Sequence, residues 1–334
     1  MTDAILLAHG SGGKLAHQLI EETILSDISN PLLARMDDSA VIDFGGRLAF
    51  TTDSYVVNPI FFPGGDIGKL AVCGTTNDLA MSGADPAYLS LAFIIEEGFP
   101  LSDLKRVLRS IRDASCEAGV QIITGDTKVV NRGCADKLYI NTAGIGKIPP
   151  GVGISGANIV PGDKIILSGP IGDHGIAIMS KREGLRFTTR LVSDCAPLSG
   201  MVAEMIATGA DIHALRDPTR GGLATTLNEL SKQSQVKIEI VEELIPVRDE
   251  VLGACEMLGF DPLYVANEGK LVAFVSPRDA RQVLDAMRRH PYGAEAQVIG
   301  EVEEAATPSV VMKTVLGASR LIDMLVGDLL PRIC

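Results

Sequence analysis

Aromatic residues are scarce in this chain of 334 residues: Trp is absent, and Phe, Trp and Tyr together make up 4%. Proteins that bind single-stranded nucleic acid stack the bases on aromatic side chains, so the composition argues against that class. An excess of cations is lacking as well, because 42 acidic and 30 basic residues give a net charge of −12. A phosphate backbone would be repelled, and an anionic substrate would need a metal ion as a bridge.

Paired cysteines and long apolar runs are also missing. The six cysteines, at 73, 116, 134, 195, 255 and 334, match neither a CxxC redox motif nor the spacing of a zinc site. The N-terminus has no basic segment followed by an apolar run, and no stretch approaches the roughly 18 apolar residues of a membrane helix. We therefore expect a soluble, cytoplasmic protein with reduced thiols.

The sequence does contain a long alternation of β-rich and helical patterns. Hydrophobic residues make up 46% and glycines number 35, which favours an α/β protein with many tight loops. The periodicity predicts strands at 48–52, 89–95, 121–124, 138–145, 164–168, 236–241, 271–276, 296–301 and 310–312. It predicts helices at 15–24, 67–81, 102–118, 172–181, 197–208, 220–233, 278–289 and 321–329.

The domain boundary is predicted at 146–153, where prolines and glycines interrupt the alternation. A glycine-rich arm at 1–46 and a first domain at 47–150 precede it. An α+β domain at 151–303 and a mobile tail at 304–334 follow it.

The last four residues of the tail are Pro331-Arg332-Ile333-Cys334, so the chain ends on a thiol. Terminal segments are usually mobile, which lets a terminal thiol enter a pocket, be modified there and swing out to a partner. The functional interpretation is a carrier or substrate thiol. The alternative is a frayed end that happens to finish in cysteine.

Acidic residues beside small residues recur at predicted strand ends and helix starts of the first half. Each one alone is explained as a cap of a helix or turn. Together they predict a divalent cation, because gathered carboxylates repel one another and Mg²⁺ binds carboxylates along with substrate phosphates. The four segments are Asp37-Asp38-Ser39-Ala40, Thr51-Thr52-Asp53, Asn77-Asp78-Leu79-Ala80 and Gly125-Asp126-Thr127-Lys128.

Three further segments have the composition of binding loops. Glycines ahead of a helix, as in His9-Gly10-Ser11-Gly12-Gly13-Lys14, let backbone N–H groups approach a phosphate, although a mobile arm is an equally good interpretation. Two glycines in a first helical turn, in Asp217-Pro218-Thr219-Arg220-Gly221-Gly222, predict a close approach to that backbone. Asn267-Glu268-Gly269-Lys270 offers Glu268 as a base, and His174 is a base or a hydrogen-bonded loop histidine.

The motifs DDSA, TTD, NDLAMSGA, GDTKVV, GPIGDHG, DPTRGGLA and NEGK follow one another from Asp37 to Lys270. In this order they resemble the ATP-dependent superfamily of aminoimidazole ribonucleotide synthase and selenophosphate synthetase. With the C-terminal cysteine, the chain is similar to the carbamoyl dehydratases of [NiFe]-hydrogenase assembly. The resemblance implies a two-domain α/β (α+β) fold and a homodimer, in which the first domains bind ATP and build a shared sheet.

The resemblance also implies ATP and Mg²⁺ as cofactors and gives the motif residues their roles. Residues expected to face metal are Asp38, Asp53, Asp78, Asp126 and Asp217. Residues expected to bind the nucleotide are Gly12, Gly13, Lys14, Asp37, Asn77, Gly125, Asp126, Thr127 and Arg220. Residues expected to take part in the chemistry are Cys334, Glu268 and Lys128.

The implied reaction is the ATP-dependent removal of water from an S-carboxamide on Cys334, which leaves a thiocyanate. The implied partners are the carbamoyltransferase HypF, which loads the thiol, and the HypC–HypD scaffold complex, whose iron receives the cyanide.

One alternative is another ATP-dependent enzyme of the same fold with an incidental cysteine, such as a small-molecule kinase. Selenophosphate synthetase is disfavoured, because its N-terminal cysteine or selenocysteine is missing and the first cysteine here is Cys73. The other alternative is a scaffold that only binds metal.

Overall fold

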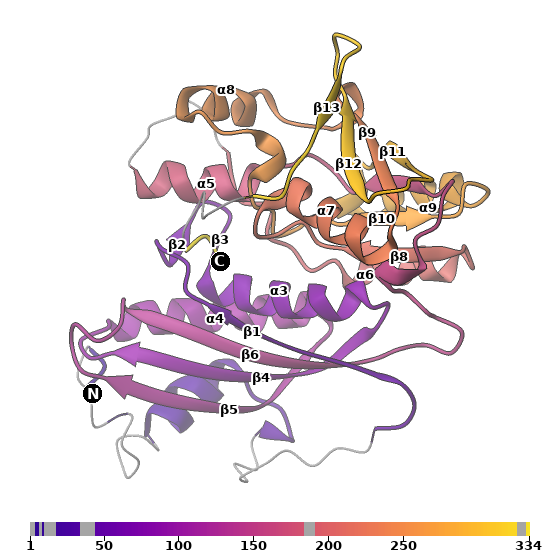
Figure 1. Cartoon of the computed structure of the whole chain (residues 1–334). Coiled ribbons are helices and arrows are strands. Elements are labelled where there is room, and N and C mark those ends of the chain that lie inside the picture. The colour runs from indigo at the N-terminus through magenta and orange to yellow at the C-terminus, as the bar shows by residue number, and fades with distance from the viewer. Residues whose placement is uncertain (1–3, 7–8, 10–17, 34–43, 184–190, 326–331) are drawn as a thin grey trace.

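The structure is a computed structural model that describes residues 4–6, 9, 18–33, 44–183, 191–325 and 332–334. Two mixed sheets dominate it, one in each half of the chain, and each carries its own helices (Figure 1). The first sheet and its helices lie below the second in that view, and the C-terminus lies between them. The two halves thus stack against each other with the end of the chain at their junction.

The first sheet has the order β1-β6-β4-β5. The parallel pair β4 and β5 is joined by helix α4, while the other neighbours are antiparallel. Helices α3 and α4 cover one face, because their apolar residues recur at helical spacing and point to the sheet. The elements are β1 (Leu48–Tyr55), α3 (Ile67–Met81), β4 (Asp85–Glu96), α4 (Leu101–Ala118), β5 (Gln121–Val130) and β6 (Leu138–Lys147).

The opposite face of the first sheet leaves apolar side chains exposed among the described residues. Residues alternate between faces along β1, so Phe50 is 71% exposed while Tyr55 is buried against α3. Leu48 on the same strand and Ile94 on β4 are also exposed. Within the described residues, this face therefore offers apolar side chains to which another surface could pack.

The second sheet has seven strands in the order β13-β12-β9-β11-β7-β10-β8. Its central strands β7 and β10 are continuous apolar runs, because helix α7 packs on one face and helices α6 and α9 pack on the other. The strands are β7 (Lys164–Leu167), β8 (Ile212–Arg216), β9 (Lys237–Val241), β10 (Val272–Val275), β11 (Gln297–Glu303), β12 (Ser309–Lys313) and β13 (Ser319–Leu321). The helices are α5 (Asp173–Arg182), α6 (Ser199–Ala207), α7 (Gly222–Ser234), α8 (Asp249–Leu258) and α9 (Ala280–Arg289).

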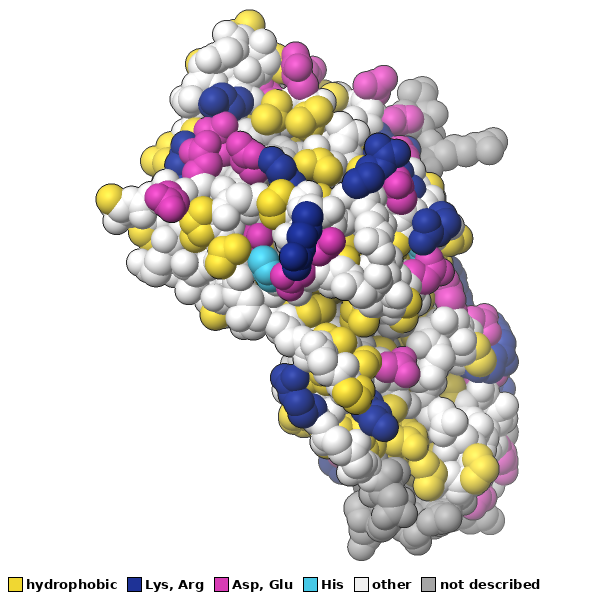
Figure 2. Space-filling model, turned by 90° about the vertical axis from the view of Figure 1, so that its right-hand side faces the viewer, with side chains coloured by type: hydrophobic (Ala, Val, Ile, Leu, Met, Phe, Trp, Pro, Cys, Tyr) yellow, Lys and Arg dark blue, Asp and Glu magenta, His cyan; other side chains and the backbone are white. Residues whose placement is uncertain are grey.

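Short elements complete the described chain. They are η2 (Ile20–Ile24), α2 (Leu25–Asp27), β2 (Phe61–Phe62), β3 (Gly65–Asp66), η4 (Gly156–Asn158), η5 (Glu242–Leu244), η6 (Pro262–Tyr264) and η7 (Pro291–Gly293). Acidic and basic side chains lie side by side over the second half of the chain on the face shown in Figure 2. Within the described ranges, no helix is long and apolar enough to cross a bilayer.

The predicted strands and helices are confirmed where the structure describes them, except near the C-terminus; residues 15–17 of the helix predicted at 15–24 lie outside the described part. The helix expected at 321–329 is wrong where it can be compared: Leu321 ends strand β13 and 322–325 are not helical, because Leu321 pairs with Val311 of β12. Residues 326–329 lie outside the described part. Strands β8 and β13 and helix α8 were not predicted. The segment 304–334 contains two strands of the second sheet, β12 and β13, and the mobility expected for its end stays a prediction.

Gly222 tests the packing at the start of α7. It has φ +60°, and a Cβ there would lie 2.5 Å from the carbonyl oxygen of Leu263 and 2.7 Å from that of Val265. The close approach predicted for this glycine is therefore made by the chain's own backbone. Gly222→Ala should lower the free energy of unfolding by about 2 kcal/mol or more, through backbone strain and steric conflict.

The matched control is Gly253→Ala in α8, where nothing lies within 4 Å of the new Cβ. Helix propensity alone should then raise stability by up to about 1 kcal/mol. Both variants are compared with the parent by thermal unfolding. Equal melting temperatures for the two variants would contradict the packing described for Gly222.

Candidate active site

Three carboxylates from three different segments lie close enough at the end of β1 for their charges to interact. Asp53 lies on β1, Asp78 lies on α3 and Asp217 follows β8. Thr51 donates a hydrogen bond of 2.9 Å to Asp78. Burial raises the pKa of Asp78, and the charge of Asp53 raises it further. Burial and then the charge of Asp78 raise the pKa of Asp217 to about 7. The folded chain therefore holds carboxyl groups where a proton or a cation is favoured.

The chemistry of this donor set fits Mg²⁺. Every donor is a carboxylate oxygen, the ligand type that hard cations prefer. Within the described residues, no three His, Cys, Asp or Glu side chains converge closely enough to hold a metal alone. A Mg²⁺ ion commonly takes its remaining ligands from water and substrate phosphates, so an open set of this kind is suited to a metal–nucleotide complex.

Two arginines lie within electrostatic range of the carboxylates. The charges of Arg216 and Arg220 lower the pKa of Asp78, although burial keeps that pKa raised overall. Arg216 also pairs with Glu229 at 2.9 Å, and Arg220 is exposed. Arg220 thus lies within electrostatic reach of the acidic end of the site, where the sequence predicts nucleotide binding.

Glu268 is buried in the loop before β10, with 4% of its surface exposed. Its Oε1 atom has no hydrogen-bond partner in the structure. Burial raises the pKa of Glu268 well above its usual value, and the neighbouring Cys195 and Asp217 raise it further. The carboxyl group therefore holds a proton more tightly than an exposed carboxylate does, and one of its oxygens has no hydrogen-bond partner within the described residues.

The backbone around Glu268 is held by Asp194, a residue that sequence reasoning missed. Asp194 accepts a hydrogen bond of 3.1 Å from the Glu268 N–H and pairs with Lys270 at 3.2 Å. Gly269 between them packs so closely that a Cβ would lie 1.8 Å from the Asp194 carbonyl oxygen. The one available signal was Lys270 in the NEGK motif, since a buried lysine requires a carboxylate partner.

Asn77 bonds to backbone groups of the second half of the chain. Its amide nitrogen donates to the carbonyl oxygens of Ala196, at 3.0 Å, and Glu268, at 3.3 Å. Its oxygen accepts from the Leu198 N–H at 2.8 Å. Because the side chain is 1% exposed and all three bonds are internal, Asn77 joins the two halves of the chain. Its binding of nucleotide stays a prediction.

The GDTK segment is not brought to the acidic cluster within one protomer. It lies on β5, and two strands separate β5 from β1, a distance of about 14 Å. Lys128 donates to Asp126 at 3.1 Å, and both side chains are more than half exposed. Asp126 and Lys128 pair in register with Ala92 and the exposed Ile94 of β4, so they belong to the uncovered face of the sheet.

Gly125 and Thr127 alternate with these two residues on β5. A Cβ at Gly125 would lie 2.4 Å from the carbonyl oxygen of Leu91, which explains the glycine by packing between strands. The Thr127 N–H donates to Asp126 at 2.9 Å. The other predicted nucleotide and metal residues lie outside the described residues: Gly12, Gly13, Lys14, Asp37 and Asp38.

The last residues of the chain are docked beside the cluster. The Val56 N–H donates to the Cys334 carbonyl at 3.1 Å, and the Asn58 N–H donates to the Arg332 carbonyl at 3.2 Å. These bonds are two residues apart on both segments, as in an antiparallel strand pair. Ile333 is 4% exposed and Cys334 is half-buried. Val56 directly follows β1, about 10 Å along the strand from Asp53, so the terminal cysteine lies near the acidic site.

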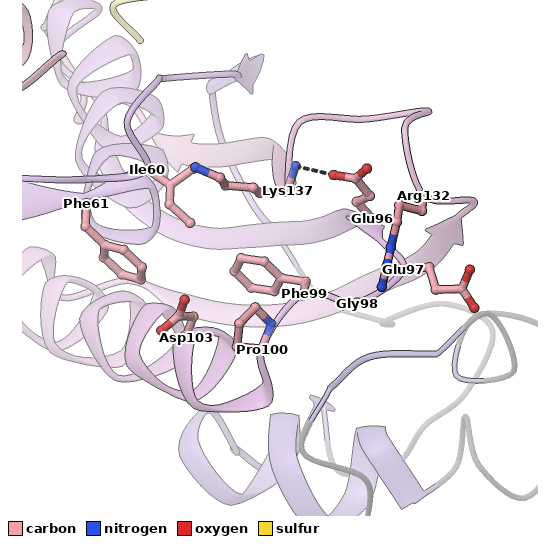
Figure 3. Close-up of a pocket in the computed structure, with 10 residues that line it drawn as sticks. All are labelled: Ile60, Phe61, Glu96, Glu97, Gly98, Phe99, Pro100, Asp103, Arg132 and Lys137. Atoms are coloured by element: carbon pink, nitrogen blue, oxygen red, sulfur yellow. Dashed lines mark hydrogen bonds between the residues drawn. The ribbon is translucent and has the colours of Figure 1, made fainter. Parts of the chain in front are cut away.

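Two pockets flank this arrangement. One of about 590 Å³ is lined in part by Asp194, Cys195 and Lys270, next to the loop of Glu268. Another, of about 450 Å³, is shown in Figure 3, where the Lys137 N–H donates to Glu96. It contains none of the predicted site residues. Lys137 in its wall follows Asp136, which pairs with Arg332 of the tail at 2.6 Å.

Family sequence models match most of the chain. The N-terminal domain of AIR synthase related proteins matches residues 36–148, and the C-terminal domain of the same family matches residues 160–313. Carbamoyl dehydratase HypE of Rhizobium leguminosarum bv. viciae is 57% identical over 330 residues, which cover 98% of this chain and 94% of that one. Its counterpart in Escherichia coli (strain K12) is 47% identical and covers 99% of both chains. The chain belongs to the HypE carbamoyl dehydratase family.

Solved structures agree with this assignment. Hydrogenase maturation protein HypE in complex with ATP matches with a TM-score of 0.96 and 50% identity, over 98% of this chain and 99% of that chain. HypE in a HypE–HypF complex matches with a TM-score of 0.82 and 49% identity, over 92% and 99%. The predicted superfamily and its two-domain α/β fold are confirmed. Thiamine-monophosphate kinase from Stenotrophomonas maltophilia K279a shares the fold alone, at 18% identity and a TM-score of 0.64.

Glu268→Gln tests the buried carboxyl group. The native pKa is raised above the unfolded value of 4.5, so the native state keeps a proton that the unfolded chain loses. The parent protein therefore loses stability as pH rises from about 4.5 toward the native pKa, and the glutamine variant escapes that loss. We expect similar melting temperatures at about pH 4.5 and a higher one for the variant at about pH 8, by a few degrees. Parallel pH profiles, measured without nucleotide, would contradict a buried neutral Glu268.

Proposed function

We propose that the chain is an ATP-dependent carbamoyl dehydratase of hydrogenase maturation whose substrate group is carried on its own last residue. It converts an S-carboxamide on Cys334 to a thiocyanate, the source of the cyanide ligand of the hydrogenase iron. The observation that carries the proposal is the docking of the Cys334 backbone on Val56, which directly follows the strand that carries Asp53. The HypE relatives are named carbamoyl dehydratases, and one solved relative holds ATP.

The reaction transfers one oxygen atom from the amide to phosphate. The amide oxygen attacks the γ-phosphorus of ATP and ADP leaves; the C–O bond then breaks, phosphate leaves and a nitrile remains on sulfur. The nitrogen gives up two protons in the process. The chain must therefore hold the carbamoyl oxygen in line with the phosphoryl group and supply a base at the nitrogen.

Glu268 fits the role of base. A carboxylate whose pKa is raised by burial is a stronger base than an exposed carboxylate, and its unpaired Oε1 is available to the amide nitrogen. The tail holds the substrate group through the backbone contacts of Arg332 and Cys334. Asp53, Asp78 and Asp217 would hold Mg²⁺, which when bound supplies positive charge to the transferred phosphoryl group.

A homodimer would bring in the GDTK segment. The uncovered face of the first sheet carries Leu48, Phe50 and Ile94, which a shared sheet would bury. Asp126 and Lys128 belong to the same face. We therefore propose that they serve a nucleotide site at the seam between subunits, where Lys128 offsets charge on the phosphoryl group.

The two proposed partners, which the family resemblance implies, load the thiol of Cys334 and unload it. HypF, which forms a complex with a solved HypE relative, would supply the carbamoyl group to Cys334. The HypC–HypD complex would accept the cyanide on its iron, in the cytoplasm. Both transfers require the end of the 304–334 segment to leave its place between the two halves of the molecule.

The reaction has a direct mass signature. Full-length protein with a carbamoylated Cys334 should lose the mass of one water molecule per chain when Mg²⁺ and ATP are added, because the amide becomes a nitrile. Mass spectrometry of the C-terminal peptide checks this, with Cys334→Ala as the control that takes no carbamoyl group. ATP hydrolysis with an unchanged peptide mass would reject the dehydration. Full ATP turnover by Cys334→Ala on a small molecule would favour a kinase.

Metal binding should depend on pH through Asp217. A proton and Mg²⁺ compete for this carboxylate, whose pKa is about 7. The affinity for Mg²⁺–ADP should rise about tenfold between about pH 6 and about pH 8, as measured by calorimetry. Asp217→Asn should bind more weakly with a flatter profile. A parent protein whose affinity is the same at both values would rule out Asp217 as a ligand.

A further inference from the structure

The docked tail makes contacts with the second half of the chain that the dehydration reaction does not explain. Figure 1 places the C-terminus between the first sheet and the region of α5. One edge of the terminal strand pairs with 56–58, as described above. On the other edge the Ile333 carbonyl meets His174 of α5, and Arg182 of α5 donates to the Arg332 carbonyl, which also accepts from Asn58. The tail is therefore held from both halves of the molecule.

His174 is the most completely enclosed of these contacts. It is 0% exposed, and its Nε2 atom lies 2.9 Å from the carbonyl oxygen of Ile333, the residue before the terminal cysteine. Its Nδ1 atom lies 2.8 Å from the Ser193 hydroxyl oxygen. The Phe62 ring packs edge-on against the imidazole, with ring centroids 5.6 Å apart. The ring is thus fixed in orientation by groups on both of its nitrogens.

The tautomer of His174 follows from these partners. A backbone carbonyl can only accept, so Nε2 carries the hydrogen and donates it to Ile333. Burial lowers the pKa of His174, which keeps the ring neutral and leaves Nδ1 as an acceptor. The Ser193 hydroxyl then donates to Nδ1, while its oxygen accepts the Cys195 N–H at 3.1 Å. A directed chain of hydrogen bonds therefore runs from Cys195 to the tail.

Arg182 holds the next residue of the tail. Its Nη2 atom donates to the Arg332 carbonyl at 2.8 Å, and its Nε atom donates to the Asn58 carbonyl at 2.8 Å. Arg332 itself has φ +54°, a backbone conformation that residues other than glycine rarely adopt. Such a conformation persists only where surrounding contacts impose it, which agrees with the number of groups gathered on this residue.

The segment that orients His174 also positions Glu268. Ser193 donates to the imidazole, and the next residue, Asp194, accepts the Glu268 N–H at 3.1 Å. The position of the tail, through His174, and that of the buried carboxyl group therefore both depend on residues 193–194. A displacement of that stretch would move both.

We propose that His174 and Arg182 are positioning residues that latch the C-terminal strand in the site, and that Ser193 sets the His174 tautomer for this purpose. The inference rests on the proposed function, since it concerns the delivery of Cys334. The latch closes on the backbone carbonyls of Arg332 and Ile333, so it acts whether or not the thiol is loaded. Release of these two bonds weakens the hold on the tail and so favours exposure of the thiol to the partners that load and unload it.

The test measures how fast the thiol of Cys334 reacts with a bulky biotin maleimide in the full-length protein. The readout is the labelled peptide 328–334, because the exposed Cys116 and Cys134 also react. Asn at position 174 ends at the depth of Nδ1 and cannot reach Ile333, whereas Gln carries an amide nitrogen at the depth of Nε2. His174→Asn should therefore raise the labelling rate about tenfold, the effect of one lost buried hydrogen bond, and His174→Gln should stay within about twofold of the parent.

Arg182→Gln gives a second test outside the buried core. It should also raise the labelling rate about tenfold, while Arg281→Gln, at an exposed arginine of α9 that pairs with Asp285, should leave it unchanged. Equal labelling of the parent, His174→Asn and Arg182→Gln would overturn the latch. So would equal rates for His174→Asn and His174→Gln in folded protein, since the donor at Nε2 would then be irrelevant.

A single-turnover assay separates the latch from the proposed function. With a carbamoylated tail, His174→Asn should dehydrate the group about tenfold more slowly than the parent at an unchanged affinity for Mg²⁺–ADP. If the parent itself forms no thiocyanate while labelling still follows the predicted order, the dehydratase proposal fails and the latch stands. If the parent forms thiocyanate and labelling is insensitive to both positions, the latch fails alone.

Discussion

One buried amide group sets the relation between the two halves of the molecule. Asn77 on α3 binds three backbone groups of the second half, those of Ala196, Leu198 and Glu268, and is almost fully enclosed. Loss of this side chain would leave three buried backbone groups without a partner, at about 1–3 kcal/mol each. The stretch 193–198 is thereby fixed on the first domain, and it carries Asp194 toward Glu268 and Ser193 toward His174. Glu268 and His174 are positioned from this joint, while the tail is also held by Val56 and Asn58 of the first half.

The electrostatics of the site explain why it suits an anionic nucleotide in a chain of net charge −12. Burial raises the pKa of Asp217 to about 7, with a further contribution from repulsion by the neighbouring Asp78 and Asp53. Repulsion of this kind is relieved by a cation, and the cation in turn attracts phosphate. Glu268 lies within electrostatic range of Asp217 and Asp53, and burial raises its pKa. The site therefore combines carboxylates that favour a cation with a carboxylate that is more basic than an exposed one.

Much of the fold could be predicted from the sequence, because local signals and packing agree. Helix α3 was predicted at its observed bounds: Asp66 caps it by accepting the Gly68 and Lys69 N–H groups. Helix α8 was missed because Gly253 interrupts its pattern, and the helix expected at 321–329 fails where β13 pairs with β12. The motifs identified the acidic residues and Glu268. They did not show that Asn77 is structural, that β5 lies two strands from β1, or that Asp194 supports Glu268, since these depend on contacts between distant segments.

The central claim is that the last side chain of the protein is delivered to a nucleotide bound at the end of β1. A crystal structure of the full-length protein with a carbamoylated Cys334, Mg²⁺ and a non-hydrolysable ATP analogue tests it most directly. The account predicts the carbamoyl oxygen about 3–3.5 Å from the γ-phosphorus, with the Cys334 carbonyl still on the Val56 N–H. A γ-phosphate bound away from Asp53, Asp78 and Asp217, or a docked sulfur more than about 10 Å from it, would contradict the account.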